Sequence, residues 1–296
     1  MGSGASAGVT ASIQASSQDD LKKLLDGLPA EARDKLKAAL VADALKADAP
    51  KEAAKEEKPA APAPAKPVES IFKFSSGLLD CCLSNPEIYK VVAEIPNARL
   101  VEMTCPPGGE DKPHDHPPHS LFFVKGGKLS ITDYVDGKPG EPHEIEVPSG
   151  APPIFSAGAH QVKNVGKEEV KALFVEPMPM CQPCGDVKDM ITPFKAKPEC
   201  YKILAENDDW ITGMVNMDPG VADSIHQHRD HLIYVLEGDG VTLYPAEEGK
   251  DGNAVPIKPG MAIPAPIKGA NGLFAKHIMK NTGSIPLKMV FFEMKR

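Results

Sequence analysis

The stretch DKPHDHPPHSLFFVKGG, residues 111–127, holds three histidines within six positions, immediately before an apolar run. A second stretch, DSIHQHRDHLIYVLEGDG at residues 223–240, has the same arrangement. The chain has nine histidines, and six of them lie in these two stretches. This concentration of imidazole in two matching places indicates a repeated site rather than scattered surface residues.

The two stretches belong to a longer internal repeat. Residues 89–126 and 201–238 align over 38 positions without a gap, and eleven of those positions are identical. All three histidines are among the identical positions, although most of the other aligned residues differ. Farther along, HQVKN at 160–164 matches HIMKN at 277–281, and the segment ALFVE then matches MVFFE. The sequence therefore predicts a tandem duplication.

The repeat and the composition divide the chain into segments. We expect an N-terminal extension (1–70), a first domain (71–180), a linker (181–192) and a second domain (193–296). Leucines at helical spacing predict two amphipathic helices over about 19–47. Residues 49–67 contain only Ala, Lys, Glu and Pro, which predicts an extended linker. The N-terminal extension as a whole is expected to be partly helical and largely disordered.

The part of the chain after residue 70 has the pattern of an all-β protein. Apolar residues make up 42% of the chain and charged residues 25%, which is typical of a soluble globular protein. Thirty prolines and 25 glycines favour short strands joined by turns. LFFVKGGKLSITDY and LIYVLEGDGVTLYP each predict a hairpin around glycine, and ALFVE and KMVFFEM predict closing strands. Each copy is therefore expected to be a small barrel or sandwich.

Several classes of protein are disfavoured. The net charge of −8 argues against a nucleic-acid partner, and no apolar run is long enough to span a membrane. A secretory signal is not expected, so a cytoplasmic location is favoured. Six cysteines are too few for a disulfide scaffold. Cys181 and Cys184 form a lone CxxC, which is typical of a redox pair, half a zinc site, or reduced thiols in a linker.

The histidines form two quartets that suit metal binding. Each copy has His-x-His-x-x-His and one more histidine 41 or 46 residues later. The candidate ligands are His114, His116, His119 and His160, and then His226, His228, His231 and His277. Two histidines at i and i+2 on a strand face the same side, and imidazole suits Fe, Zn, Cu, Ni or Mn. His119 and His231 lie an odd number of residues from the preceding histidine pair, so a regular strand would turn them to the opposite face. A bulge or turn would bring each back to the site, and without one each site has three histidines.

These features resemble the cupin superfamily, and the whole chain resembles a bicupin. The first motif of that family matches Gly109, His114, His116 and Gly126, and then Gly220, His226, His228 and Gly238. The second motif matches Pro148, Gly150, His160 and Asn164, and then Pro259, Gly260, His277 and Asn281. Where many cupins carry an acidic ligand, this chain has His119 and His231, and each domain resembles the small metal-binding cupins of the beta-alanine-degradation-protein type.

The resemblance implies two double-stranded β-helix (jelly-roll) barrels, each with a divalent metal near one mouth. It favours an oxygenase-type enzyme with Fe(II) acting on a small organic molecule. A non-redox lyase or isomerase using Zn or Mn is the alternative enzyme, with Tyr134, Tyr234 or Tyr244 as base. We expect Phe122, Phe123, Phe155 and Tyr234 on the substrate pocket wall.

A third alternative is a non-catalytic module that binds a metal or small ligand and is tethered to a membrane. The opening residues MGSGAS match the pattern for myristoylation of Gly2, which would give weak membrane association. The same residues are typical of a disordered start or a cloning scar. Small cupins commonly pair, so a homodimer is compatible with the resemblance.

Overall fold

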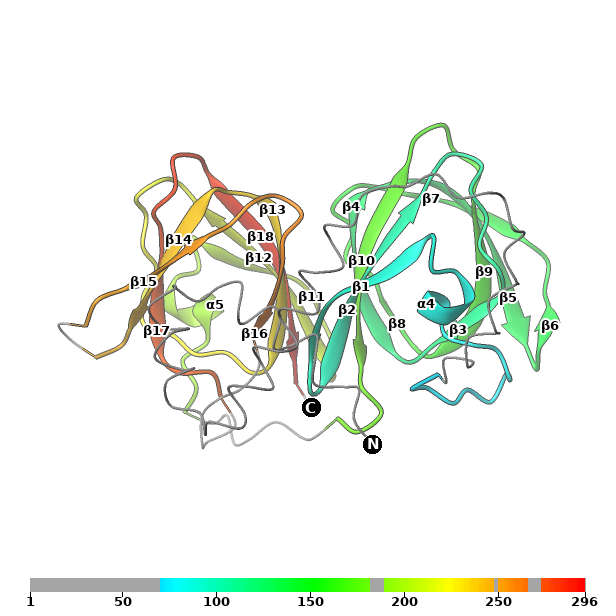
Figure 1. Ribbon diagram of the computed structural model, residues 1–296, viewed down its shortest axis with the longest axis horizontal. Helices are drawn as coiled ribbons and strands as arrows, with labels where there is room; N and C mark the ends of the chain where they lie inside the picture. The colour runs from blue at the N-terminus through cyan, green and yellow to red at the C-terminus, as the bar shows by residue number, and fades with distance from the viewer. Residues whose placement is uncertain (1–69, 182–188, 248–249, 266–272, 296) are drawn as a thin grey trace, which may run out of the picture. The chain divides into compact units, whose positions relative to one another are not determined.

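The computed structural model describes residues 70–181, 189–247, 250–265 and 273–295, shown in colour in Figure 1. Almost all regular structure in these residues is strand, and it forms two tandem antiparallel barrels. The expected all-β fold is therefore confirmed. The expected helices at 19–47, the linker at 49–67 and Gly2 lie outside the described residues.

The first barrel comprises a short helix and ten strands. They are α4 (Cys81–Ser84), β1 (Tyr89–Ile95), β2 (Ala98–Cys105), β3 (His114–His116), β4 (His119–Lys125), β5 (Gly127–Val135), β6 (Lys138–Pro139), β7 (His143–Val147), β8 (Ile154–Phe155), β9 (Gly158–Asn164) and β10 (Val170–Pro177). One sheet has the order β1-β2-β10-β4-β8, and the other has β3-β9-β5-β6 with β7 also paired to β5.

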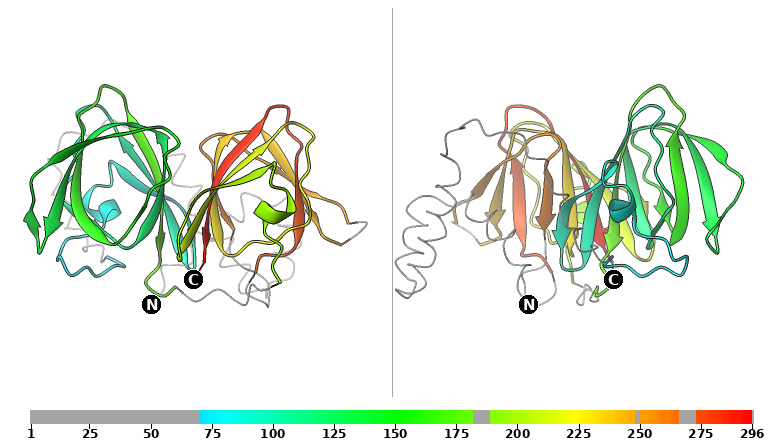
Figure 2. Two further views of the ribbon diagram at one scale, coloured as in Figure 1. Left: turned by 180° about the vertical axis from the view of Figure 1, so that it is seen from behind. Right: turned by 45° about the vertical axis from the view of Figure 1, so that its right-hand side comes forward.

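The second barrel repeats this plan, with fewer strands among its described residues. Its elements are α5 (Pro193–Ala196), β11 (Tyr201–Glu206), β12 (Trp210–Met217), β13 (His231–Glu237), β14 (Gly240–Pro245), β15 (Asn253–Pro256), β16 (Ala262–Ala265), β17 (His277–Asn281) and β18 (Leu287–Met294). The sheets have the orders β11-β12-β18-β13-β16 and β15-β14-β17. Figure 2 shows the strands of each copy curving around their own interior.

The two expected hairpins are wrong, although their strands form as expected. β4 pairs with β10 and β8, whereas β5 pairs with β6, β7 and β9, so the two strands belong to facing sheets. β13 and β14 are separated in the same way. The glycine between the strands marks a crossing from one sheet to the other. A Cβ on Gly126 would lie 2.0 Å from the Val147 carbonyl oxygen, so only glycine lets the backbones pass this closely.

A shared apolar cluster packs the two barrels against each other. It includes Leu100 and Phe122 of the first barrel and Leu232, Tyr234 and Phe292 of the second. Phe122 and Tyr234, expected on a pocket wall, are thus placed at the contact between the barrels. Within the described part of the chain, no helix has the length and apolarity needed to cross a membrane.

Polar contacts accompany this cluster. The Tyr234 hydroxyl donates to Glu102 at 2.6 Å. The buried hydroxyls of Ser120 and Thr212 meet at 2.6 Å. These bonds are satisfied only when the barrels are together, so they tie the fold of one copy to the other.

Candidate metal centres

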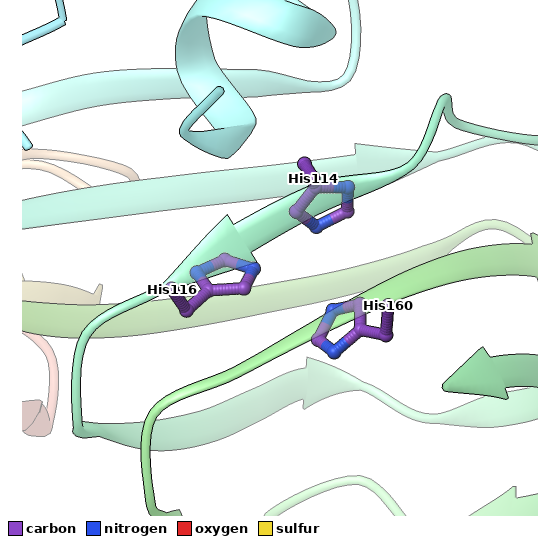
Figure 3. Close-up of side chains that lie close together, drawn as sticks. All are labelled: His114, His116 and His160. Atoms are coloured by element: carbon purple, nitrogen blue, oxygen red, sulfur yellow. The ribbon is translucent and has the colours of Figure 1, made fainter. Parts of the chain in front are cut away.

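The first barrel brings three histidines together at one end of its interior. His114 and His116 lie on β3, and His160 lies opposite His114 on the neighbouring strand β9. Figure 3 shows their rings gathered in the same space. One ring nitrogen from each lies within 4.8 Å of the others. The i, i+2 spacing and the cross-strand pairing therefore build the first histidine triad (His114, His116 and His160).

The second barrel builds the second histidine triad (His226, His228 and His277) in the same way. The backbones of His226 and His277 exchange two hydrogen bonds of 3.1 Å, which fixes them opposite each other. The ring nitrogens of the triad also lie within 4.8 Å of one another. The Nε2 atoms of His226 and His228 are only 2.9 Å apart.

Backbone carbonyls orient most of these rings. The carbonyl two residues earlier lies 2.8–2.9 Å from Nδ1 of His114, His119, His226, His231 and His277. A carbonyl only accepts, so each Nδ1 carries the proton and each Nε2 keeps its lone pair. Nε2 of His114 is buried without a partner, and the facing lone pairs of His226 and His228 repel unless a cation lies beside them. Both triads therefore fit a metal ion.

Burial keeps these imidazoles in the form that binds metals. Burial, the largest cause, lowers the pKa of His114, His160 and His231 to about 3. Burial likewise lowers the pKa of His116 and His228 well below its ordinary value. The rings are therefore neutral near pH 7, as metal coordination requires.

A buried glutamate lies behind the central histidine of each triad. Nδ1 of His116 donates to Glu176 at 2.7 Å, and Nδ1 of His228 donates to Glu293 at 3.2 Å. Both glutamates are fully buried, and burial raises the pKa of each above its ordinary value. An adjacent arginine opposes that rise and favours the carboxylate. Such a carboxylate fixes the ring and increases the basicity of the nitrogen that faces the metal.

The compensating arginine comes from a different place in each barrel. Arg99 on β2 donates through Nε to Glu176 at 2.6 Å, and its Nη2 reaches Asp80 at 3.2 Å. In the second barrel, Arg229 follows His228 directly and donates to Glu293 at 2.8 Å. The alignment places Ile211 opposite Arg99 and Pro117 opposite Arg229. Each barrel therefore compensates its buried glutamate with an arginine from a different position in the repeat.

A fourth histidine lies beside each triad. β3 ends at His116 and β4 begins at His119, so the strand is interrupted at Pro117-Pro118, as the odd spacing of His119 requires. The ring centroid of His119 lies 4.7 Å from that of His116, and His231 lies 4.3 Å from His228. Neither belongs to the sets whose nitrogens all lie within 4.8 Å. A ligand role for His119 and His231 stays a prediction.

Each triad opens into a cavity, and the two cavities differ in size. The first has a volume of about 820 Å³ and is lined by His116, His119 and His160 together with Phe123 and Phe155. The second has a volume of about 370 Å³. Phe122, Tyr234 and Tyr134 line neither cavity. Tyr134 lies half-buried on β5.

The sequence interpretation missed four further residues beside the triads. The Tyr89 hydroxyl donates to Asp111 at 2.6 Å, and Tyr201 donates to Asp223 at 2.5 Å. The other oxygen of each aspartate accepts a backbone N–H from β9 or β17 at 2.7 Å. Burial raises the pKa of Asp111 to about 7. Both pairs are identical in the aligned repeat, which was the signal that could have revealed them.

Cysteines lie near the first triad without completing it. A possible ligand set joins Cys81 with His116 and Glu176. Burial raises the pKa of the Cys81 thiol well above its ordinary value, which disfavours the thiolate that binds metals. Of the expected CxxC pair, Cys181 is described and Cys184 lies outside the described residues.

Known proteins are similar to this chain only at low sequence identity. No family model matches the chain, and neither does any curated sequence. Among similar solved structures, a cupin 2 conserved barrel domain protein from Leptotrichia buccalis is 12% identical, with a TM-score of 0.41, covering 70% of this chain and 88% of its own. Momordica charantia 7S globulin is 14% identical, with a TM-score of 0.42 and coverages of 67% and 73%. An oxalate decarboxylase variant from B. subtilis is 15% identical, with a TM-score of 0.45 and coverages of 69% and 71%. These similarities leave the reaction open.

Proposed function

We propose that this chain is a metal-dependent bicupin enzyme of the oxygenase type, with its working site in the first barrel. The observation that carries the proposal is the position of the first triad, whose neutral imidazoles converge at the wall of a large apolar cavity. A cavity of about 820 Å³ lies within the range of small-molecule sites. A small organic molecule in it would meet His116, His119 and His160 directly.

His114, His116 and His160 would hold a divalent transition metal, Fe(II) by preference, with Zn, Mn, Ni or Cu as alternatives. The ion would supply a Lewis acid and, as iron, one-electron chemistry. Glu176 keeps the His116 ring in place and directs its Nε2 away from the carboxylate. The apolar wall excludes water from the bound molecule, and Phe123 and Phe155 limit its orientation.

A non-redox lyase or isomerase is the second candidate, and His119 is the observation that favours it. Its Nε2 keeps a lone pair because Nδ1 donates to the Pro117 carbonyl at 2.8 Å. His119 lines the cavity outside the three-nitrogen set, so this nitrogen could move a proton if it is not a ligand. Tyr134 and Tyr234 are not placed for that role. The membrane-tethered module rests on Gly2 and stays a prediction.

Metal analysis of chain purified without added metal tests the proposal. We expect about two equivalents of metal, with His114→Ala and His226→Ala each losing one. Oxygen uptake with a panel of small oxidisable acids and diketones should then require the first site and survive His226→Ala. The lyase or isomerase would be favoured if the chain turned over substrate without oxygen while it held Zn or Mn, and if His119→Gln abolished that turnover. A metal-free protein in which neither triad takes up any ion would refute both enzymes.

A further inference from the structure

We infer that the first cavity takes a molecule with one metal-binding oxygen head and an uncharged, apolar body, and that the second cavity does not take such a molecule. The inference rests on the proposed function only in that a metal at the first triad receives the head. The shape and charge of the walls carry the rest.

The wall of the first cavity beyond the histidines is apolar. It is built from aliphatic and aromatic side chains of both sheets, among them Leu121, Phe123, Leu129, Ile131, Ile145 and Phe174. His116, His119 and His160 form the part of the wall that faces the metal site, so a bound molecule has one end where it can meet the metal. Burial of its body against these side chains is favourable in proportion to apolar area.

No lysine or arginine lines either described cavity. Arg99 is buried and engaged by Glu176 and Asp80, so it does not offer its charge to the cavity. Besides the histidines at the triad, the acidic and basic wall residues are Asp133, His143 and Glu146, all exposed. The buried Tyr89 also lines the wall, and its hydroxyl donates to Asp111. A single anionic head would be offset by the metal. A second carboxylate at the far end of the molecule would meet apolar wall or negative charge, which is unfavourable.

One aligned position near the last triad histidine differs in side-chain size between the cavities. Three residues before the last triad histidine, the first barrel has Ala157 and the second has Phe274. Both residues line their cavities. The Phe274 ring lies 5.7 Å from the His231 ring and 5.3 Å from the His277 ring, measured between centroids. This ring lies beside both His231 and His277. In the first barrel the Phe155 ring lies 5.7 Å from the His119 ring, and Ala157 puts only a methyl group at the position that Phe274 occupies.

The experiment compares octanoate with octanedioate, which share a chain length and differ in the second carboxylate. Binding to the full chain loaded with Co(II) is measured by calorimetry and by the change in the visible spectrum of the ion. We expect one octanoate per chain and binding of octanedioate weaker by on the order of 100-fold. Removing the metal with a chelator should weaken octanoate binding at least tenfold, because the head loses its partner.

Matched variants assign the binding to the first barrel. Leu121 and Ile233 occupy the same aligned position, and each lines its own cavity. Leu121→Arg should bring octanedioate to parity with octanoate, because the guanidinium can pair with the distal carboxylate. Ile233→Arg should leave both affinities unchanged. Ala157→Phe should reduce octanoate binding at least tenfold while two equivalents of Co(II) remain bound.

Equal or tighter binding of octanedioate to the unmodified chain would overturn the inference, as would octanoate binding that ignores the metal. A change in either affinity in Ile233→Arg, with none in Leu121→Arg, would overturn the assignment to the first barrel. Absence of octanoate binding to the loaded chain would also overturn it. Failure of the proposed function is distinct: the selectivity between the two acids would hold with no turnover of any oxidisable substrate.

Discussion

Replacing Glu176 with glutamine tests how much the buried carboxylate contributes to metal binding at the first triad. In the structure, Glu176 accepts from His116 at 2.7 Å and from Arg99 at 2.6 Å through different oxygens. Glutamine offers one acceptor oxygen in place of two, and it carries no charge. The substitution therefore weakens the support of His116 while it changes the volume of the core very little.

The expected loss follows from the two kinds of hydrogen bond. A bond to a charged group contributes about 1.5–3 kcal/mol and a neutral one about 1 kcal/mol, so the difference is roughly 0.5–2 kcal/mol. That difference corresponds to about a 2- to 30-fold weaker metal affinity. The second barrel supplies a graded comparison, because the bond from His228 to Glu293 is longer, at 3.2 Å. Glu293→Gln should therefore cost less affinity at its own site than Glu176→Gln does at the first.

The assay is a competition between the metal-free chain and a chelator of known affinity. Each substitution is read in a background that retains only its own site, using His226→Ala for Glu176→Gln and His114→Ala for Glu293→Gln. Thermal unfolding of the metal-free chain serves as the control, because loss of a partner for Arg99 also destabilises the fold by about 1–3 kcal/mol. An affinity at the first site that stays within twofold of its original value would refute the role assigned to Glu176.

Three further predictions concern stability. Burial lowers the pKa of His114 to about 3 from 6.5, so the unfolded chain binds more protons between those values. Stability of the metal-free chain should therefore fall as pH decreases below about 6.5, and urea midpoints should fall less steeply in His114→Ala. Thr212→Val leaves the buried Ser120 hydroxyl without its partner and should cost about 1–3 kcal/mol, whereas adding Ser120→Ala should recover part of that loss. A Cβ on Gly213 would lie 2.4 Å from the Phe291 ring, so Gly213→Ala should cost about 1–3 kcal/mol and weaken metal binding at the second triad alone, as chelator competition would show.

The arrangement of the histidines was predictable because it follows from local geometry. Alternation along a strand places His114 and His116 on one face whatever the rest of the barrel does. The matching spacing in the two copies then identified His160 and His277 as partners far along the chain. Metal binding itself remains a prediction that these positions support.

The residues that support the rings were harder to find, for physical reasons. A glutamate near the end of a strand ordinarily faces solvent, so Glu176 and Glu293 gave no sign of burial although both end matching segments. Their arginines lie at unaligned positions, so comparing the copies could not reveal them. Phe122 and Tyr234 looked like wall residues because an apolar strand has two buried faces when a second barrel packs on its outside.

The two copies have diverged where the physics of the site permits it. A buried carboxylate must be compensated, but Arg99 and Arg229 show that the compensating charge can come from either side of the glutamate. The histidines allow no such freedom, because each ring nitrogen must reach a common point. Residues that line the cavities near the triads, such as Ala157 and Phe274, neither compensate a buried charge nor hold the metal, so they are free to differ. Because a bound ion stabilises the folded state whether or not substrate enters, the second triad can persist beside a smaller cavity even when only the first site works.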